Sequence, residues 1–318
     1  MKRALSALLL AVAVLDVSAQ AWPSKAVHAI VPVGAGSSTD IVHRIVLEQL
    51  AVQLGQPIIV ENRVGAGGTV GTALVAKAPA DGYTLLANGA AHTIAPALYK
   101  NLSYDPVRDF AAVVPLGSSP SVLVVAPLKE IRKTAELIAA GLARPNGLTF
   151  SSVGIGTATH LSAERFLAST GITAVHLPFK GGAEAMTEVI AGRADFFFGP
   201  VALVLPQIRA NKLIALAVNT TKRSVALPEV PTLAEQGVTA AEYPIWFGLL
   251  APVGTPRDVV ERLNRETQHV LATPKVRDRL VDLGVDPMSM SPDEFTVYVQ
   301  REMGLNAALA QKAGLKPE

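Results

Sequence analysis

The residues best suited to chemistry lie in two small, hydroxyl-rich loops, Gly34-Ala35-Gly36-Ser37-Ser38-Thr39-Asp40 and Val153-Gly154-Ile155-Gly156-Thr157-Ala158-Thr159-His160. Each follows an apolar run and precedes apolar residues at helical spacing, which predicts a strand, a Gly-rich loop and a helix N-terminus. Free N–H groups and the positive end of the helix dipole bind anions at such a terminus. We therefore expect two anion-binding loops on opposite sides of a cleft.

Other polar or small residues follow further predicted strands. Ligands of open parallel sheets bind beyond the carboxyl ends of the strands, so these loops should share one rim. Asn88 to His92 follow the strand Tyr83–Ala87, Lys180 follows Val175–Leu177, and Gly199 follows Asp195–Phe198. The predicted ligand-binding residues are Val33, Ala35, Gly36, Ser37, Ser38, Asp40, Asn88, His92, Gly156, Thr157, Ala158, Thr159, His160, Lys180 and Gly199.

Three of these side chains have two interpretations each. Asp40 either bonds a ligand ammonium or hydroxyl group, or supports the start of its own helix. His160 either takes part in catalysis, or stays neutral and hydrogen-bonds within its turn or to ligand. Lys180 either pairs with a carboxylate or is a solvated lysine at a helix start. The loops contain few arginines, so backbone N–H groups, hydroxyls and water would hold a carboxylate.

Enzymatic motifs are incomplete. A dinucleotide fingerprint needs glycine where Thr39 stands, although Glu61 lies at the end of the next strand. The chain has neither a phosphate-binding G-x-x-x-x-G-K-[ST] loop nor a G-x-S-x-G nucleophile motif. No two histidines show metal-ligand spacing, so we predict no metal site and no cofactor. An exported α/β hydrolase that uses His160 or Ser37 remains the enzymatic alternative.

The segments that carry these loops alternate between strands and helices. This alternation predicts an α/β fold in which mainly parallel sheets are flanked by helices. The length of 318 residues suits two lobes. We assign residues 22–122 and 241–318 to lobe 1 and residues 123–240 to lobe 2, with the ligand cleft between them. Ser118-Ser119-Pro120 is a candidate hinge.

The N-terminus and the composition indicate an exported globular protein. Lys2 and Arg3 precede the apolar stretch Ala4–Leu15, and Ala19-Gln20-Ala21 resembles a signal-peptidase site. We therefore predict a secretory signal over residues 1–21 and a periplasmic mature chain from Trp22. The formal net charge is +2 without a basic cluster, which argues against nucleic-acid binding. The absence of cysteine excludes disulfides and thiolate chemistry.

A series of short motifs along the chain resembles one known family, the periplasmic solute-binding proteins of tripartite tricarboxylate transporters, or Bug family. The motifs include Trp22-Pro23-Ser24-Lys25, Ile30-Val31-Pro32, Leu54-Gly55-Gln56-Pro57, Val60-Glu61-Asn62-Arg63, Ala80-Asp81-Gly82-Tyr83-Thr84-Leu85-Leu86, Tyr104-Asp105-Pro106, Gly156-Thr157 with His160-Leu161, Pro178-Phe179-Lys180-Gly181, and Trp246-Phe247-Gly248-Leu249. Their order and spacing together make the resemblance specific.

The resemblance implies a Venus-flytrap fold of the type II periplasmic-binding-protein kind. It further implies a non-enzymatic protein that closes on a small organic carboxylate and docks on membrane permease subunits. We expect a monomer. Gly36-Ser37 stands where the family often has two glycines, and Ala35 replaces a frequent proline, so the particular ligand does not follow from the family. A sensor subunit for a membrane kinase, with the same pocket, is a third possibility.

Overall fold

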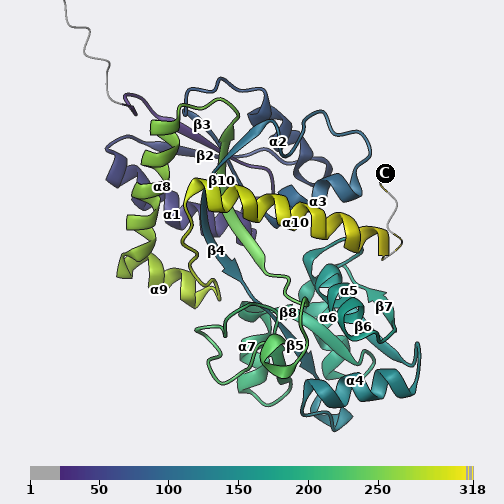
Figure 1. Ribbon diagram of the computed structural model, residues 1–318. Coiled ribbons are helices and arrows are strands. Elements are labelled where there is room, and N and C mark those ends of the chain that lie inside the picture. The colour runs from purple at the N-terminus through teal and green to yellow at the C-terminus, as the bar shows by residue number, and fades with distance from the viewer. Residues whose placement is uncertain (1–21, 313, 315–316, 318) are drawn as a thin grey trace, which may run out of the picture.

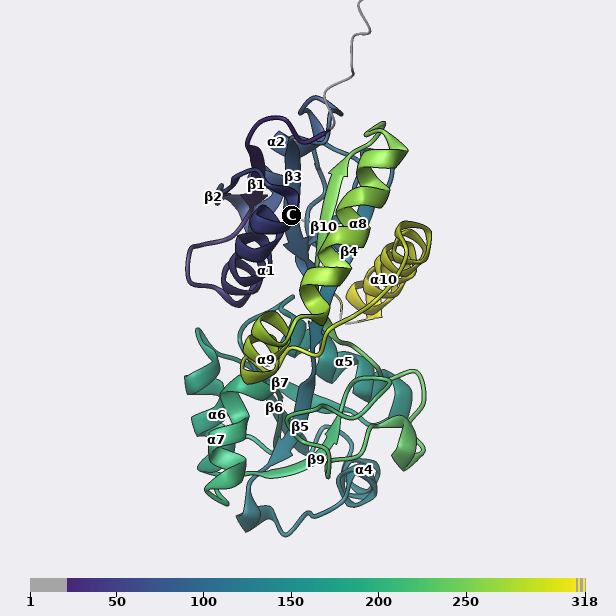
Figure 2. The same ribbon diagram turned by 90° about the vertical axis from the view of Figure 1, so that its left-hand side faces the viewer.

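Two five-stranded sheets organise the chain, one in each of two lobes (Figure 1). The computed structural model describes residues 22–312, 314 and 317. The predicted signal sequence and its cleavage site therefore lie outside the described residues. In Figure 2 the lobe with the first sheet lies above the lobe with the second. We call these lobe 1 and lobe 2.

The sheet of lobe 1 has the strand order β2-β1-β3-β10-β4. Its strands are β1 (Val27–Val31), β2 (Ile58–Asn62), β3 (Thr84–Gly89), β4 (Phe110–Ser119) and β10 (Ile245–Pro252). β1 runs parallel to β2 and β3, whereas β10 runs antiparallel to β3 and β4. The helices of this lobe are α1 (Ser38–Leu54), α2 (Thr69–Ala76), α3 (Ala90–Leu98), α8 (Arg257–Ala272), α9 (Pro274–Asp282) and α10 (Pro292–Lys312).

The sheet of lobe 2 repeats this plan in the order β7-β6-β8-β5-β9. Its strands are β5 (Ser121–Val125), β6 (Leu148–Ser152), β7 (Ala174–Pro178), β8 (Phe196–Pro200) and β9 (Ile214–Val218). The antiparallel strand, β5, again takes the fourth position, between β8 and β9. The helices are α4 (Thr134–Ala143), α5 (Ala158–Thr170), α6 (Gly182–Ile190) and α7 (Val201–Arg209).

Central strands are apolar because helices cover both faces of the sheet. Every residue of Val122–Val125 in β5 is fully buried, as expected of a strand between two helical layers. On one face, Phe150 and Phe196 pack with Phe166 of α5. The predicted two-lobed α/β fold with mainly parallel sheets, the Venus-flytrap arrangement, is therefore confirmed.

The lobes also touch outside the strand connections. Leu161 of α5 in lobe 2 belongs to the same buried cluster as Trp246 and Phe295 of lobe 1. Near α9, Ser118 and Asp286 exchange two backbone hydrogen bonds of 2.8 Å, and the Asp286 carboxylate accepts from the Val225 N–H at 3.3 Å. α9 thus lies at the junction of the lobes (Figure 2). Within the described part of the chain, no helix combines the length and apolarity needed to cross a membrane.

Candidate ligand-binding loops

The loop between β1 and α1 is folded onto the carboxylate of Asp40. Asp40 Oδ2 accepts from the Gly36 N–H at 2.9 Å, while Oδ1 accepts from Arg44 Nε at 2.9 Å and Asn62 Nδ2 at 2.8 Å. Asn62 also donates to the carbonyl of Val33 at 3.0 Å. Burial raises the pKa of Asp40, but the hydrogen bonds from Arg44, Gly36 and Asn62 outweigh it and lower the pKa overall. Asp40 is thus an ionised brace that shapes the loop.

Local sequence explains this turn. Ser37 is the N-cap of α1, and its hydroxyl accepts from the Asp40 N–H at 3.3 Å. Gly36 has φ +79°, a left-handed conformation that favours glycine. The loop is therefore fixed by its own residues together with one side chain from β2.

The loop between β6 and α5 has the same turn with a different brace. Gly156 has φ +75°, and its N–H donates to Nδ1 of His160 at 3.0 Å. Thr157 is the N-cap residue, but its hydroxyl donates to the Gly154 carbonyl at 2.7 Å. Thr159 Oγ1 accepts from the Val153 N–H at 3.0 Å. Of the two interpretations of His160, the structure shows the hydrogen bond within its own turn.

The two loops are equivalent position by position. Gly36, Ser37 and Asp40 correspond to Gly156, Thr157 and His160, with residue numbers that differ by 120. In both loops the glycine N–H donates to the side chain four residues later. In both, the N-cap carbonyl accepts the first helical N–H, from Ile41 or Leu161, at 2.9 Å.

This arrangement leaves several backbone donors of the described loops without a protein acceptor. In the first loop these are the N–H groups of Ala35, Ser38 and Thr39. In the second they are the N–H groups of Ile155, Ala158, Thr159 and His160. Because each set lies at a helix N-terminus, each can bind an anionic oxygen.

Asn88 and His92 lie elsewhere than predicted, because β3 continues to Gly89 and passes directly into α3. Asn88 is a strand residue, 2% exposed, whose side chain accepts from the Gly89 N–H at 2.9 Å. His92 lies in α3, is 1% exposed and pairs through Nε2 with the Pro106 carbonyl at 2.9 Å. The expected loop after this strand is absent, so the prediction of His92 in a rim loop is wrong.

Gly199 and Lys180 also differ from their predicted setting. Gly199 lies inside β8 opposite Val122, and an added Cβ would overlap side-chain atoms of Val204 and Phe197. Its role is therefore close packing, and the predicted loop position is wrong. Lys180 does lie in a loop after a strand; it is exposed, and its N–H donates to Glu184 at 3.2 Å. Both interpretations of its ammonium group stay open.

The sequence patterns miss three residues that shape the loops. Arg44 and Asn62 hold Asp40, as described above. Ser152 accepts from the Gly154 N–H at 3.0 Å, and its hydroxyl lies 2.6 Å from Nε2 of His176. Asn62 was detectable in principle, since it ends the strand parallel to β1 and so must lie on the same rim.

The second loop abuts lobe 1. A Cβ added to Gly156 would lie 3.1 Å from Leu98 at the end of α3. Tyr99, the next residue, lies against Gly67 of the Gly-rich segment that follows β2. The loop between β6 and α5 of lobe 2 therefore lies next to the part of lobe 1 that follows β2 and β3.

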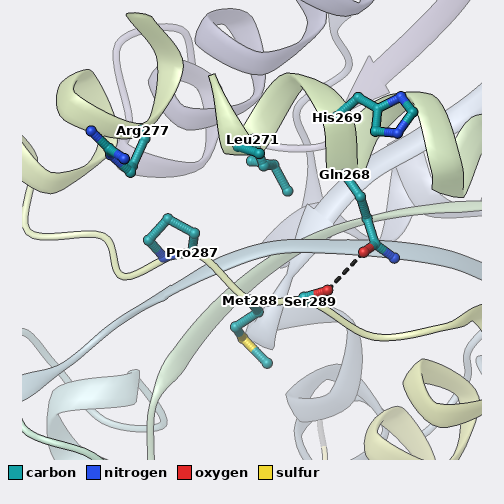
Figure 3. A pocket seen from close by; sticks show the side chains of 8 residues that line it. Gln268, His269, Leu271, Arg277, Pro287, Met288 and Ser289 are labelled. Atoms are coloured by element: carbon teal, nitrogen blue, oxygen red, sulfur yellow. Dashed lines mark hydrogen bonds between the residues drawn. The ribbon is translucent and has the colours of Figure 1, made fainter. Parts of the chain in front are cut away.

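A separate cavity of about 400 Å³ lies between α8, α9 and residues 287–289 (Figure 3). Leu271, Pro287 and Met288 line its apolar part, and the Ser289 hydroxyl donates to Gln268 at 2.7 Å. No lining residue belongs to either loop. Among the described residues, no group of three or more His, Asp or Glu side chains is arranged to hold a metal ion.

Comparison with known proteins identifies relatives along nearly the whole chain. BugT of Bordetella pertussis is 33% identical over 302 residues, which cover 94% of this chain and 93% of BugT. The structure of Rpa4515 from R. palustris with adipate is 31% identical with a TM-score of 0.75, covering 93% of this chain and all of that one. MatC from Rhodopseudomonas palustris with bound malate is 30% identical with a TM-score of 0.71, covering 91% and 100%.

A family model described as "Tripartite tricarboxylate transporter family receptor" matches residues 42–315. This description is of a receptor, and the solved relatives hold small carboxylates, so the hydrolase alternative is set aside. The match includes both loop helices, α1 from its fifth residue onward and all of α5. The chain belongs to the tripartite tricarboxylate transporter receptor family.

Proposed function

We propose that the protein captures a small organic dicarboxylate between the loops Gly34–Asp40 and Gly154–His160. The observation that carries this proposal is the pair of equivalent helix N-termini, each with backbone N–H groups that lack a protein acceptor. Adipate and malate, bound in the two solved relatives, each have two carboxylates. One carboxylate for each loop would use both sets of donors.

Neutral donors are sufficient for such a ligand. Arg44, which contacts the first loop through Asp40, is already engaged by Asp40 and Asn62. Helix-terminal N–H groups and the hydroxyls of Ser37, Ser38 and Thr157 would then stabilise each carboxylate without a dedicated counter-charge. The lobes would close on the ligand about the segment Ser118–Pro120, where β4 of lobe 1 passes into β5 of lobe 2.

The membership in a transporter receptor family also supports a role in transport across the membrane. We propose that the loaded protein acts as a periplasmic monomer and delivers its ligand to the permease subunits of a tripartite tricarboxylate-type transporter. A sensor role would use the same pocket. Deletion of the gene separates the two, because uptake is lost in the first case, whereas induction is lost with uptake intact in the second.

A thermal-shift screen of the mature chain, freed of co-purified ligand, tests the binding role. The screen compares mono-, di- and tricarboxylates of matched length. A ligand at 100 times its dissociation constant adds about 2.7 kcal/mol to the free energy of unfolding, which is visible as a raised Tm. We expect the largest shift with a dicarboxylate. A folded, ligand-free protein that responds to none of these acids would contradict the proposal.

A further inference from the structure

The two loops are braced by side chains of different acid–base character. Gly36 N–H donates to a carboxylate whose pKa is lowered, so this acceptor persists throughout the neutral and mildly acidic range. Gly156 N–H donates to an imidazole nitrogen instead. An imidazole is the side chain that ordinarily changes charge between about pH 5 and 8. The equivalent turns therefore have unequal sensitivity to protons.

The hydrogen bond from Gly156 fixes the tautomer of His160. Because Nδ1 accepts an N–H at 3.0 Å, it must be unprotonated, and the neutral ring carries its hydrogen on Nε2. Nε2 lies 3.5 Å from Oε1 of Glu164. Protonation would place a second hydrogen on Nδ1, directly opposite the Gly156 N–H. The loop would then lose its acceptor and face a donor in its place.

The ring of His160 is buried and stacked on other side chains of lobe 2. His160 is 3% exposed and stacks on His176 with ring centroids 4.0 Å apart, and both rings stack on Phe150. Glu164 of α5 faces the rings as a carboxylate, with Oε1 3.5 Å from Nε2 of His160. From β6, the uncharged Phe150 and Ser152 contact the rings. Burial lowers the pKa of His176 to about 4, the neighbouring His160 adds to this effect, and Glu164 opposes it.

His176 supports the same loop through Ser152. Its Nε2 lies 2.6 Å from the Ser152 hydroxyl oxygen, which accepts the Gly154 N–H at 3.0 Å. This contact tolerates either charge state of His176, since the hydroxyl can accept from Nε2–H and donate to the Gly154 carbonyl at 3.1 Å. The contact between Gly156 and His160 has no such alternative, because a backbone N–H only donates.

We propose that His160 is a positioning residue whose neutral ring holds the anion-binding loop of lobe 2, so that protonation of His160 releases this loop and weakens carboxylate binding. This inference rests on the proposed function of the loops as carboxylate-binding sites. It assigns the proton sensitivity to lobe 2 alone, because the brace of lobe 1 is a carboxylate.

The structural part is tested without any ligand, by following backbone amide and imidazole ¹⁵N resonances of the mature protein over about pH 5 to 8. The Gly156 amide should titrate together with Nδ1 of His160, while the Gly36 amide should not move over this range. In His160→Asn, whose side-chain oxygen can accept from Gly156, the Gly156 titration should vanish. A Gly156 resonance that is insensitive to the His160 titration in the wild-type protein would overturn the proposal.

The functional part uses adipate as the probe in calorimetric titrations. Titrations at about pH 8 and about pH 5 bracket the range in which an imidazole ordinarily changes charge. Protonation of His160 should weaken adipate binding by the wild-type protein about threefold to tenfold, the equivalent of one hydrogen bond. His160→Asn should show the same affinity at both pH values and also corrects for any protonation of adipate. His160→Ala should bind weakly at both pH values.

If adipate fails to bind at any pH, the proposed function fails for this ligand, while the amide titration still decides the role of His160. Binding with the same pH profile in wild type and His160→Asn overturns the inference.

Discussion

Backbone N–H groups, more than side chains, define the proposed binding loops. The ionisable side chains of the turns point inward: Asp40 and His160 each accept from the glycine N–H of their own loop. Sequence patterns single out these residue types because they suit ligand contacts. In the structure these side chains bond within their own loops, and the backbone N–H groups at the helix starts keep no protein acceptor. Substitutions that each delete one of these N–H groups therefore test the proposed site.

Proline at the first position of each loop helix should remove one such donor without disturbing the fold. Ser38 and Ala158 are the first residues of α1 and α5, and the preceding residues have extended conformations that proline accepts. Ser38→Pro or Ala158→Pro should weaken dicarboxylate binding by about 1.5 to 3 kcal/mol, the range for hydrogen bonds to charged groups. Calorimetry measures the loss.

Ser38→Ala is the matched control for this prediction, because it keeps the N–H and removes only the hydroxyl. It should retain more affinity than Ser38→Pro, and all three variants should unfold within a degree or two of the wild-type protein. Undiminished affinity in both proline variants would show that these N–H groups do not contact the ligand.

His92 makes the protein sensitive to acid through its stability. Burial lowers its pKa to about 4, so the folded protein keeps this ring neutral while the unfolded chain binds a proton below about pH 6.5. A depressed pKa contributes stability above the unfolded value and loses it as the pH falls towards the folded value. Between about pH 6.5 and pH 4 this residue should therefore account for a loss of roughly 3 kcal/mol of unfolding free energy.

His92→Gln tests this assignment, since its amide can still donate to the Pro106 carbonyl but does not titrate. Urea unfolding at several pH values should give a shallower acid-side slope for the variant than for the wild-type protein. His269→Gln, at a position whose side chain is 66% exposed, is the control for removal of a histidine from the surface. Equal slopes for wild type and His92→Gln would rule out the assignment.

Among the elements, β10 explains why the residues after β3 lie in a strand and a helix and not in the predicted loop. It inserts between β3 and β4 and pairs Phe247 with Gly89. This pairing extends β3 two residues beyond the predicted end and places Asn88 inside a sheet. The Gly89 Cα then packs so closely on β10 that an added Cβ would overlap the carbonyl oxygen of Trp246.

Gly89→Ala should therefore destabilise the protein by about 1 to 3 kcal/mol, because the new methyl group meets backbone that cannot move independently of the sheet. Chemical denaturation followed by circular dichroism measures the change. Gly34→Ala is the control: nothing lies within 4 Å of an added Cβ there, and its φ is not left-handed. A stability loss of similar size in both variants would count against the strand-packing explanation.

Local signals predict the local structure well. Glycines and hydroxyls followed by apolar residues at helical spacing predict the two loops, and the structure begins α1 and α5 directly after them. The wrong predictions for His92 and Gly199 have the same cause. β3 and β8 both extend beyond their predicted ends, because β3 pairs with β10 and β8 pairs with β5. Such partners lie far away in the sequence, and periodicity within a window does not report them.

At the scale of the whole molecule, the two lobes are variations on one plan. Both sheets have four parallel strands and one antiparallel strand at the fourth position. Both place a Gly-rich turn after the strand that is second in this order. The proposed site is therefore pseudo-symmetric, which suits a ligand with like groups at both ends, while the difference between Asp40 and His160 makes its two halves chemically unequal.

The position of β10 has a consequence for the nascent chain. All five strands of the lobe 2 sheet are present once residue 218 has been made, whereas the lobe 1 sheet lacks a central strand until residue 252. Chains are synthesised from the N-terminus and their domains tend to fold in that order. Here the order is reversed: the lobe that begins first is completed last. Until then β3 and β4 present open edges, so the half-built first lobe is the stage at which this protein is most exposed to pairing with the wrong strand.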